Sequence, residues 1–168
     1  MKVLGRASGF TEEYIEKLST ASMMHDIGKL MISEDILDKP SKLTDEEYAI
    51  MKNNVLYWEA LLHNTTGDIM SMARTIALQH HEKWDGTGYL GMKGTDITYI
   101  ARLMALADVF DALMSRRYYK DGWNIDEAYK EIVNCSGTHF DPDVVQLFVE
   151  HFDAFKKIAE DIPDKQIY

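Results

Sequence analysis

The sequence predicts an all-α protein, a bundle of helices interrupted by one glycine-rich loop. Proline is scarce, with three in 168 residues, and apolar residues recur mostly at helical spacing. Residues 82–95 (EKWDGTGYLGMKGT) are the exception, because they hold four of the ten glycines and show no helical period. The length suits one domain with a substantial core, and no repeat or linker divides residues 1–168. We therefore expect a single domain.

Capping signals and apolar stripes predict three helices in the first half of the chain. A side-chain oxygen before the first turn marks two of the starts, and apolar spacing marks the third. The expected helices are residues 11–28 behind Thr11, residues 44–63 behind the capping box of Thr44 and Glu47, and residues 69–80.

Three further helices are expected after the glycine-rich loop: residues 97–117 behind Asp96, residues 124–137 behind Asn124 with Glu127, and residues 141–158 behind Asp141 and Pro142. The first of them is apolar nearly all round, which predicts burial at the centre of the bundle. Asp108 and Asp111 within that helix are therefore expected to need partners.

Composition excludes several classes of partner. The formal net charge is −10, so the chain repels nucleic acid, and we expect no DNA or RNA partner. No uncharged apolar run approaches the roughly 18 residues of a membrane span, so we expect no membrane insertion. The single cysteine, Cys135, cannot form an internal disulfide, which suits a reducing compartment. These observations together predict a cytoplasmic protein.

Histidine and aspartate residues cluster in a pattern that indicates a metal site. His25-Asp26 and His80-His81 each stand at the end of an expected helix, where adjacent side chains can converge on one point. Asp108 lies in the central helix. Imidazole nitrogens with carboxylates suit zinc, manganese or iron, and packing does not explain so many such residues together.

The sequence resembles the HD-GYP family, a subgroup of the HD superfamily of metal-dependent phosphohydrolases. The resemblance covers about residues 21–148 and rests on the order and spacing of HDIGK (25–29), KLTDEEYAIMK (42–52), HHEKWDGTGY (80–89), ADVFDALMSRRYYK (107–120) and GTHFDPDVV (137–145). It implies an all-α HD-domain bundle that hydrolyses the bacterial messenger cyclic di-GMP with a metal-activated water. The family commonly carries two or three iron or manganese ions, and we expect one or two here.

The resemblance also implies roles for individual residues. The implied metal ligands are His25, Asp26, His80, His81 and Asp108, with Asp26 bridging. Lys29 matches a catalytic lysine that faces the scissile phosphate, and the matching substrate contacts are Tyr89, Arg117 and Lys120. Arg116, Arg117 and Lys120 also form a local cationic cluster in an otherwise acidic chain, which a phosphate-bearing ligand needs.

The chain departs from the family pattern at three places. Asn54 stands where the family has a histidine, and an asparagine offers a transition metal only a neutral carbonyl oxygen. Leu90 replaces the proline of the glycine-rich loop. The family has a further histidine, and often a glutamate, on a helix before HDIGK, whereas no histidine precedes His25. We therefore expect that upstream helix to be absent and metal affinity to be reduced.

Three functions stay open at this point. The first is a cyclic di-GMP phosphodiesterase. The second is a degenerate domain that binds the dinucleotide or a signalling partner without turnover, which Asn54 favours. The third is an HD-superfamily phosphohydrolase for another nucleotide, against which the WDGTGY loop argues. The resemblance further implies a GGDEF-type cyclase domain as a partner, and a second copy of the chain could complete the fold.

Overall fold

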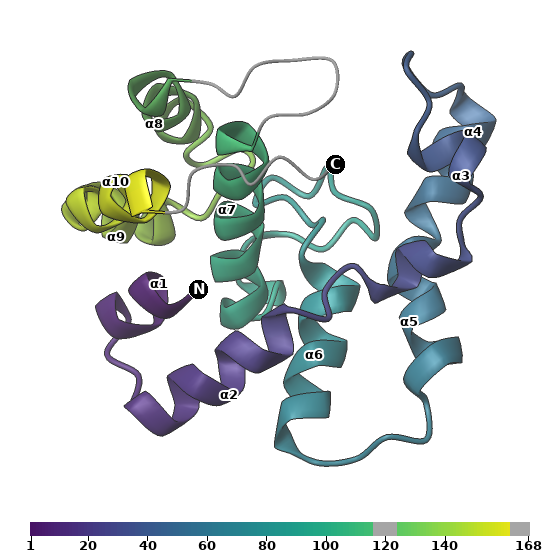
Figure 1. The fold of residues 1–168 in the computed structure, drawn as a ribbon, viewed down its shortest axis with the longest axis horizontal. Coiled ribbons are helices and arrows are strands. Elements are labelled where there is room, and N and C mark those ends of the chain that lie inside the picture. The colour runs from purple at the N-terminus through teal and green to yellow at the C-terminus, as the bar shows by residue number, and fades with distance from the viewer. Residues whose placement is uncertain (116–123, 162–168) are drawn as a thin grey trace.

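The computed structural model describes residues 1–115 and 124–161, in which every regular element is a helix and there is no β-strand. This confirms the predicted all-α class. Figure 1 shows the order of the elements. They are α1 (Lys2–Ala7), α2 (Glu12–Ser22), the 3-10 helix η1 (Ile27–Met31), α3 (Glu34–Leu37), α4 (Asp45–Lys52), α5 (Asn54–Leu62), α6 (Asp68–Gln79), the 3-10 helix η2 (Gly94–Asp96), α7 (Tyr99–Met114), α8 (Ile125–Asn134), α9 (Pro142–Glu150) and α10 (Phe152–Asp161).

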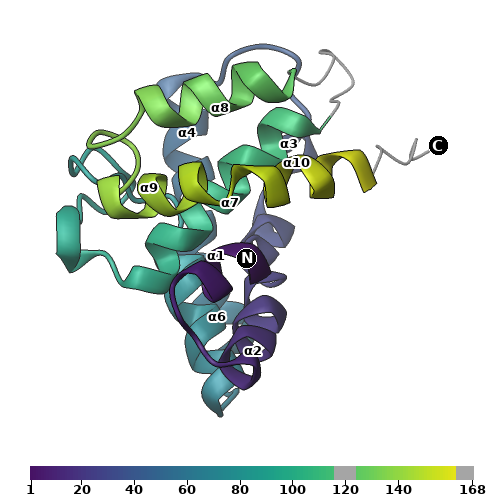
Figure 2. The ribbon, with the colours of Figure 1, turned by 90° about the vertical axis from the view of Figure 1, so that its left-hand side faces the viewer.

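Helix α7 lies at the centre and separates two parts of the core, as its apolar sequence predicts. On one side, Leu106 and Phe110 pack with α8, α9 and α10, where Phe148 is fully buried. On the other side, Met104 packs with apolar residues of α2, α5 and α6, including Trp58. Figure 2 shows α9 and α10 following one another across the face of α7. The central helix therefore holds its residues at fixed positions relative to both halves of the bundle.

The predicted capping residues begin their helices as expected. The side chain of Thr11 accepts a hydrogen bond from the backbone N–H of Tyr14 at the start of α2. Full capping boxes open α4, through Thr44 and Glu47, and α8, through Asn124 and Glu127. The carboxylate of Asp141 caps α9, with Pro142 in its first turn. Each cap satisfies backbone N–H groups that the first turn leaves without partners.

Two helices predicted as continuous are each broken in two. The helix expected over residues 44–63 divides at Asn53, whose N–H bonds back to Ile50 and Met51 and tightens the turn between α4 and α5. The helix expected over residues 141–158 divides at His151 into α9 and α10. The second break lets Phe148 and Phe155 both contact the ring of Phe110. Contacts with a distant helix thus accompany the break at His151, and a local backbone turn makes the break at Asn53.

Other predicted helix ends were also wrong. Asp96 does not cap α7: it closes η2, and Thr98 is the N-cap, with its N–H bonded to the side-chain oxygen of Gln79. Helix α2 ends at Ser22, before Gly28, and α8 ends at Asn134. Asp111 is exposed and needs no buried partner.

No helix among the described residues is long and apolar enough to span a membrane.

Candidate metal centre

His25 and Asp26 lie in the turn between α2 and η1. The Nδ1 atom of His25 is 2.8 Å from the carbonyl oxygen of Ser22, which orients the ring at the end of α2. The Nε2 atom then faces two carboxylates, at 3.3 Å from Asp26 Oδ2 and 3.4 Å from Asp108 Oδ1. Helix α7 supplies Asp108, so the centre of the bundle meets the HDIGK turn here.

His80 and His81 follow the last turn of α6. His80 is 2% exposed, and its Nδ1 lies 3.0 Å from the carbonyl oxygen of Ile76 and 3.1 Å from that of Ala77. Its Nε2 is turned towards Asp26 Oδ1, 3.6 Å away. The rings of His80 and His81 have centroids 3.9 Å apart. The end of α6 thus presents two imidazoles to the same carboxylate.

These side chains form two overlapping groups with the geometry of a metal site. Ligand atoms lie within 4.8 Å of one another in the group His25, His80 and Asp108, and in the group Asp26, His80 and His81. Because the Nδ1 of His80 faces backbone carbonyls, its Nε2 is the free ligand atom, and one nitrogen serves one ion. The two carboxylates, Asp26 and Asp108, each have two oxygens, and the bridging role of Asp26 stays a prediction.

The donor atoms fit a divalent transition metal. The Nε2 of His80 and the Oδ1 of Asp26 are buried, face each other, and have no hydrogen-bond partner among the described residues. Unpartnered buried polar atoms are costly unless something else satisfies them. His25 and His80 each direct the other ring nitrogen to a backbone carbonyl, as metal-binding histidines commonly do. The residues therefore fit the cofactor that the sequence predicts.

The charges and the burial of the cluster shift the pKa values of His25 and His81 in opposite directions. Burial opposes protonation of His25, but the carboxylates of Asp108 and Asp26 outweigh it and raise its pKa to about 10. Burial also disfavours the charged form of Asp26, yet His25, His80 and Lys29 together hold the pKa of this carboxyl well below its usual range. Burial, with His80 nearby, lowers the pKa of His81 to about 3. His81 is thus neutral at pH 7, the form that binds metal.

Lys29 contacts the cluster directly. Its Nζ donates a hydrogen bond to Asp26 Oδ2 at 2.6 Å, three residues along the HDIGK turn. The ammonium therefore lies at the carboxylate that we expect to bridge. This position agrees with a role beside a scissile phosphate, which stays a prediction.

The glycine-rich loop brings Tyr89 onto the same cluster. The ring of Tyr89 packs against His81, with centroids 4.6 Å apart. Burial, together with nearby Tyr48 and Asp26, raises the pKa of Tyr89 to about 12, so its hydroxyl keeps its proton at neutral pH. Leu90, in place of the family's proline, is exposed beside it.

Glu82 holds this loop in place, a role that the sequence analysis did not assign. The side chain is 2% exposed, and its two oxygens accept hydrogen bonds from the N–H groups of Leu90, at 2.6 Å, and Met92, at 2.7 Å. Gly88 passes so close that a Cβ there would lie 2.5 Å from the Cα of Glu82. The sequence did offer one signal for this role: Glu82 directly follows His80-His81 at the start of the glycine-rich loop. A carboxylate at such a buried place needs hydrogen-bond donors, and the loop backbone supplies them.

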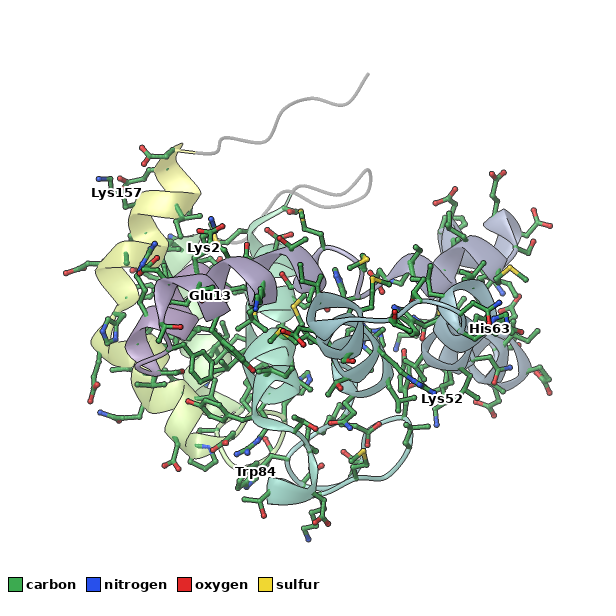
Figure 3. The ribbon with its side chains drawn as sticks, turned by 90° about the horizontal axis from the view of Figure 1, so that it is seen from below. Lys2, Glu13, Lys52, His63, Trp84 and Lys157 are labelled. Atoms are coloured by element: carbon green, nitrogen blue, oxygen red, sulfur yellow. The ribbon has the colours of Figure 1, made fainter. Side chains whose placement is uncertain are left out.

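The loop is also fixed from its outer side. The N–H groups of Trp84 and Asp85 donate to the carbonyl oxygens of His139 and Thr138, at 3.0 and 2.9 Å. The guanidinium of Arg102 lies 5.7 Å from the centroid of the Trp84 ring, and Figure 3 labels Trp84 on the loop. The segment between α8 and α9 thus supports the loop that carries Tyr89.

Three residues singled out in the sequence remain: Asn54, which is buried, and Arg117 and Lys120, which the structure does not describe. Asn54 is 3% exposed, and its side-chain Oδ1 has no hydrogen-bond partner within the described residues. Arg117 and Lys120 lie outside the described residues, so their predicted contacts with substrate stay predictions.

The fold and the site together define a class of protein: a helical bundle with a histidine–aspartate centre where the turn after α2, the end of α6 and α7 meet. Comparison with protein families agrees, because the HD domain model matches residues 1–144. The chain belongs to the HD domain family. The resemblance read from the sequence motifs is thereby confirmed.

Curated relatives extend the comparison. The chain is 41% identical over 162 residues to a 3'3'-cGAMP-specific phosphodiesterase 2 of Vibrio cholerae, covering 96% of this chain and 31% of the relative. It is 45% identical over 160 residues to a cyclic di-GMP phosphodiesterase of the same organism, covering 92% and 32%. A cyclic di-GMP phosphodiesterase of Thermotoga maritima is 40% identical over 143 residues, covering 84% and 39%. The chain thus spans about a third of the length of these relatives.

Proposed function

We propose that this chain is a phosphodiesterase domain that hydrolyses a cyclic dinucleotide, with cyclic di-GMP as the first candidate substrate. The observation that carries the proposal is the buried pair of Asp26 Oδ1 and His80 Nε2, which face each other with no hydrogen-bond partner in the described part of the chain and belong to the group Asp26, His80 and His81. The relatives named as cyclic di-GMP and 3'3'-cGAMP phosphodiesterases support the choice of substrate class.

The metal ligands in this proposal are His25, Asp26, His80, His81 and Asp108. Their nitrogen and carboxylate donors suit iron or manganese, one or two ions. A divalent ion bound there supplies a Lewis acid for the phosphate and lowers the pKa of a water molecule.

The chain's own residues orient and neutralise the substrate. Lys29, whose ammonium lies beside Asp26, offsets charge that develops on the phosphate oxygens during cleavage. Tyr89 keeps its phenolic proton and can donate a hydrogen bond next to His81. Glu82 keeps Tyr89 in position by fixing the backbone that follows it. Arg117 and Lys120 complete the proposed substrate contacts.

A direct assay tests the proposal. The protein is loaded with ferrous iron under anaerobic conditions, or with manganese. It is then incubated with cyclic di-GMP or with 3'3'-cGAMP, and the products are separated by chromatography. We expect hydrolysis that a chelator abolishes and fresh metal restores, and a loss of about 100-fold or more in Asp26→Asn. Asp35→Asn, on exposed α3, is the matched control. Hydrolysis that survives both chelation and Asp26→Asn contradicts the proposal.

A second candidate function is binding of the dinucleotide without turnover. Asn54 favours it, because this buried position has a neutral amide where the family has a histidine. The same assay, accompanied by calorimetric binding, separates the two: binding with no product from either dinucleotide identifies the binding domain.

The proposal also covers binding partners and the place of the protein in the cell. Leu90 is exposed on the loop through which family members contact GGDEF-type domains, and we retain such a domain as a candidate partner. A homo-oligomer and a cytoplasmic location also remain our expectations.

A further inference from the structure

Tyr48 and Lys52 lie one turn apart on α4 and meet Tyr89 of the glycine-rich loop. The rings of Tyr48 and Tyr89 are perpendicular, with centroids 5.9 Å apart. The Nζ of Lys52 lies 5.3 Å from the centroid of Tyr48 and 5.7 Å from that of Tyr89. Residues four apart share one face of a helix, so α4 presents both side chains to the loop together. Figure 3 labels Lys52 in this region.

We propose that Tyr48 and Lys52 form a second substrate-binding subsite, in which Lys52 pairs with the phosphate of the cyclic dinucleotide that is not being cleaved and Tyr48 stacks on a purine base. The proposal rests on the function proposed above. It gives a ligand-binding role to Tyr48 and Lys52 of the KLTDEEYAIMK segment, which otherwise supplies the capping box of α4.

The subsite is continuous with the metal centre. Tyr89 contacts Tyr48 on one side and His81 on the other, and His81 belongs to the group with Asp26 and His80. One aromatic ring therefore separates the α4 pair from the candidate metal ligands. A dinucleotide with one phosphate at the metal centre would therefore have Tyr89, and α4 behind it, next to the rest of the molecule.

Lys52 keeps its charge available for a ligand. Within the described residues its ammonium has no carboxylate partner, whereas the ammonium of Lys29 bonds to Asp26 and that of Lys39 to Glu47. Contact with two aromatic faces holds the ammonium in place without neutralising it. In a chain of net charge −10, an unpaired cation at the rim of the site attracts an anion.

Tyr48 likewise keeps a surface available. Its side chain is 45% exposed although it touches Tyr89. An exposed aromatic ring beside a cation is the combination by which proteins hold nucleotides, since the ring stacks on a base and the ammonium binds a phosphate.

The experiment compares Lys52→Met, Lys52→Arg and the control Lys42→Met on two substrates. Methionine keeps the apolar stem on the tyrosine rings and removes only the charge. Lys42 is an exposed lysine in the same segment. The substrates are cyclic di-GMP, with two phosphates and two bases, and bis(p-nitrophenyl) phosphate, with one phosphate and no base. Dissociation constants for cyclic di-GMP are measured by calorimetry alongside KM and kcat.

We expect Lys52→Met to raise both the KM and the Kd for cyclic di-GMP by about 10- to 100-fold, because one charged hydrogen bond is lost. The KM for bis(p-nitrophenyl) phosphate should change less, because this substrate has no second phosphate. Lys52→Arg restores most of the affinity. Tyr48→Leu weakens binding, whereas Tyr48→Phe, which keeps the ring, does not. Lys42→Met behaves as the wild type.

Two results overturn the subsite. The first is an unchanged Kd for cyclic di-GMP in Lys52→Met. The second is an equal effect of this substitution on both substrates, which indicates a general disturbance of the centre. Failure of the proposed function is a separate result: a wild-type protein that binds the dinucleotide without cleaving it still tests Lys52 through Kd. A wild type that neither binds nor cleaves it overturns both proposals.

Discussion

Gly28 lies directly against the backbone carbonyl of Asn54, so closely that a Cβ on Gly28 would stand 1.9 Å from that oxygen. This contact joins the HDIGK turn to the start of α5. It explains why the turn carries glycine, and it places the backbone of position 54 next to the segment that supplies His25, Asp26 and Lys29.

Replacement of Gly28 by alanine is expected to force η1 and α5 apart. Overpacking in a core costs about 1–3 kcal/mol in the free energy of unfolding, and the blocking group here is backbone, which cannot rotate away. Urea unfolding measures the loss, and metal content is expected to fall with it. Gly5→Ala is the control, because its Cβ would meet only the side chain of Ile15, at 3.1 Å. Equal, small losses in both variants would contradict the role of the Gly28 contact.

Asn54→His is expected to raise metal content and phosphodiesterase rate. The position is buried and its Oδ1 has no described partner, so an imidazole there restores a stronger donor than the amide. We expect a gain of about 10- to 100-fold in affinity or rate, measured by elemental analysis and by the dinucleotide assay. Asn53→His, one residue earlier, is the control.

Two other outcomes of Asn54→His are informative. Metal content that rises without hydrolysis would mean that ligands other than position 54 limit turnover. Metal content and rate that both stay unchanged in a folded variant would show that position 54 does not correspond to the family's ligand.

Glu82→Gln is expected to loosen the loop that carries Tyr89. The amide supplies one acceptor oxygen where the carboxylate supplied two, and it turns an NH2 group towards a backbone N–H. A fully buried donor left without a partner costs about 1–3 kcal/mol of stability, and these part-buried donors should cost less. We expect a lower melting temperature and a raised KM for the dinucleotide. The exposed Glu46→Gln is the control, and a Glu82→Gln protein as stable as that control would argue against the role of Glu82.

The free energy of unfolding is expected to decrease as the pH is lowered below about 6.5, and His139 is one cause. Burial, with the Lys83 ammonium nearby, lowers the pKa of His139 from 6.5 to about 4. Between these values the unfolded chain binds a proton that the native protein does not, so the stabilisation present above pH 6.5 is lost as pH falls towards 4. Urea unfolding at pH 7 and pH 5 measures the loss, which should be smaller in His139→Gln. The exposed His151→Gln is the control; an equal reduction there would sink the assignment to His139.

The sequence by itself determined the features that depend on neighbouring residues. The caps at Thr11, Thr44, Asn124 and Asp141 were predictable because each cap is a bond between residues within one turn. The central position of α7 was predictable as well, since a helix that is apolar nearly all round must be covered on all sides. The family motifs indicated the histidine and aspartate cluster before its geometry was known.

Only the tertiary structure decided how distant segments meet. The approach of His25 to Asp108, the bonds of Glu82 to the loop and the contact of Tyr48 with Tyr89 depend on the packing of separate helices. The break at His151 has the same origin, because a helix that continued straight would carry Phe155 away from the ring of Phe110 that it contacts. Helical periodicity records which face of a segment is buried, but the position of the segment along its neighbour is set by side chains that interlock in space.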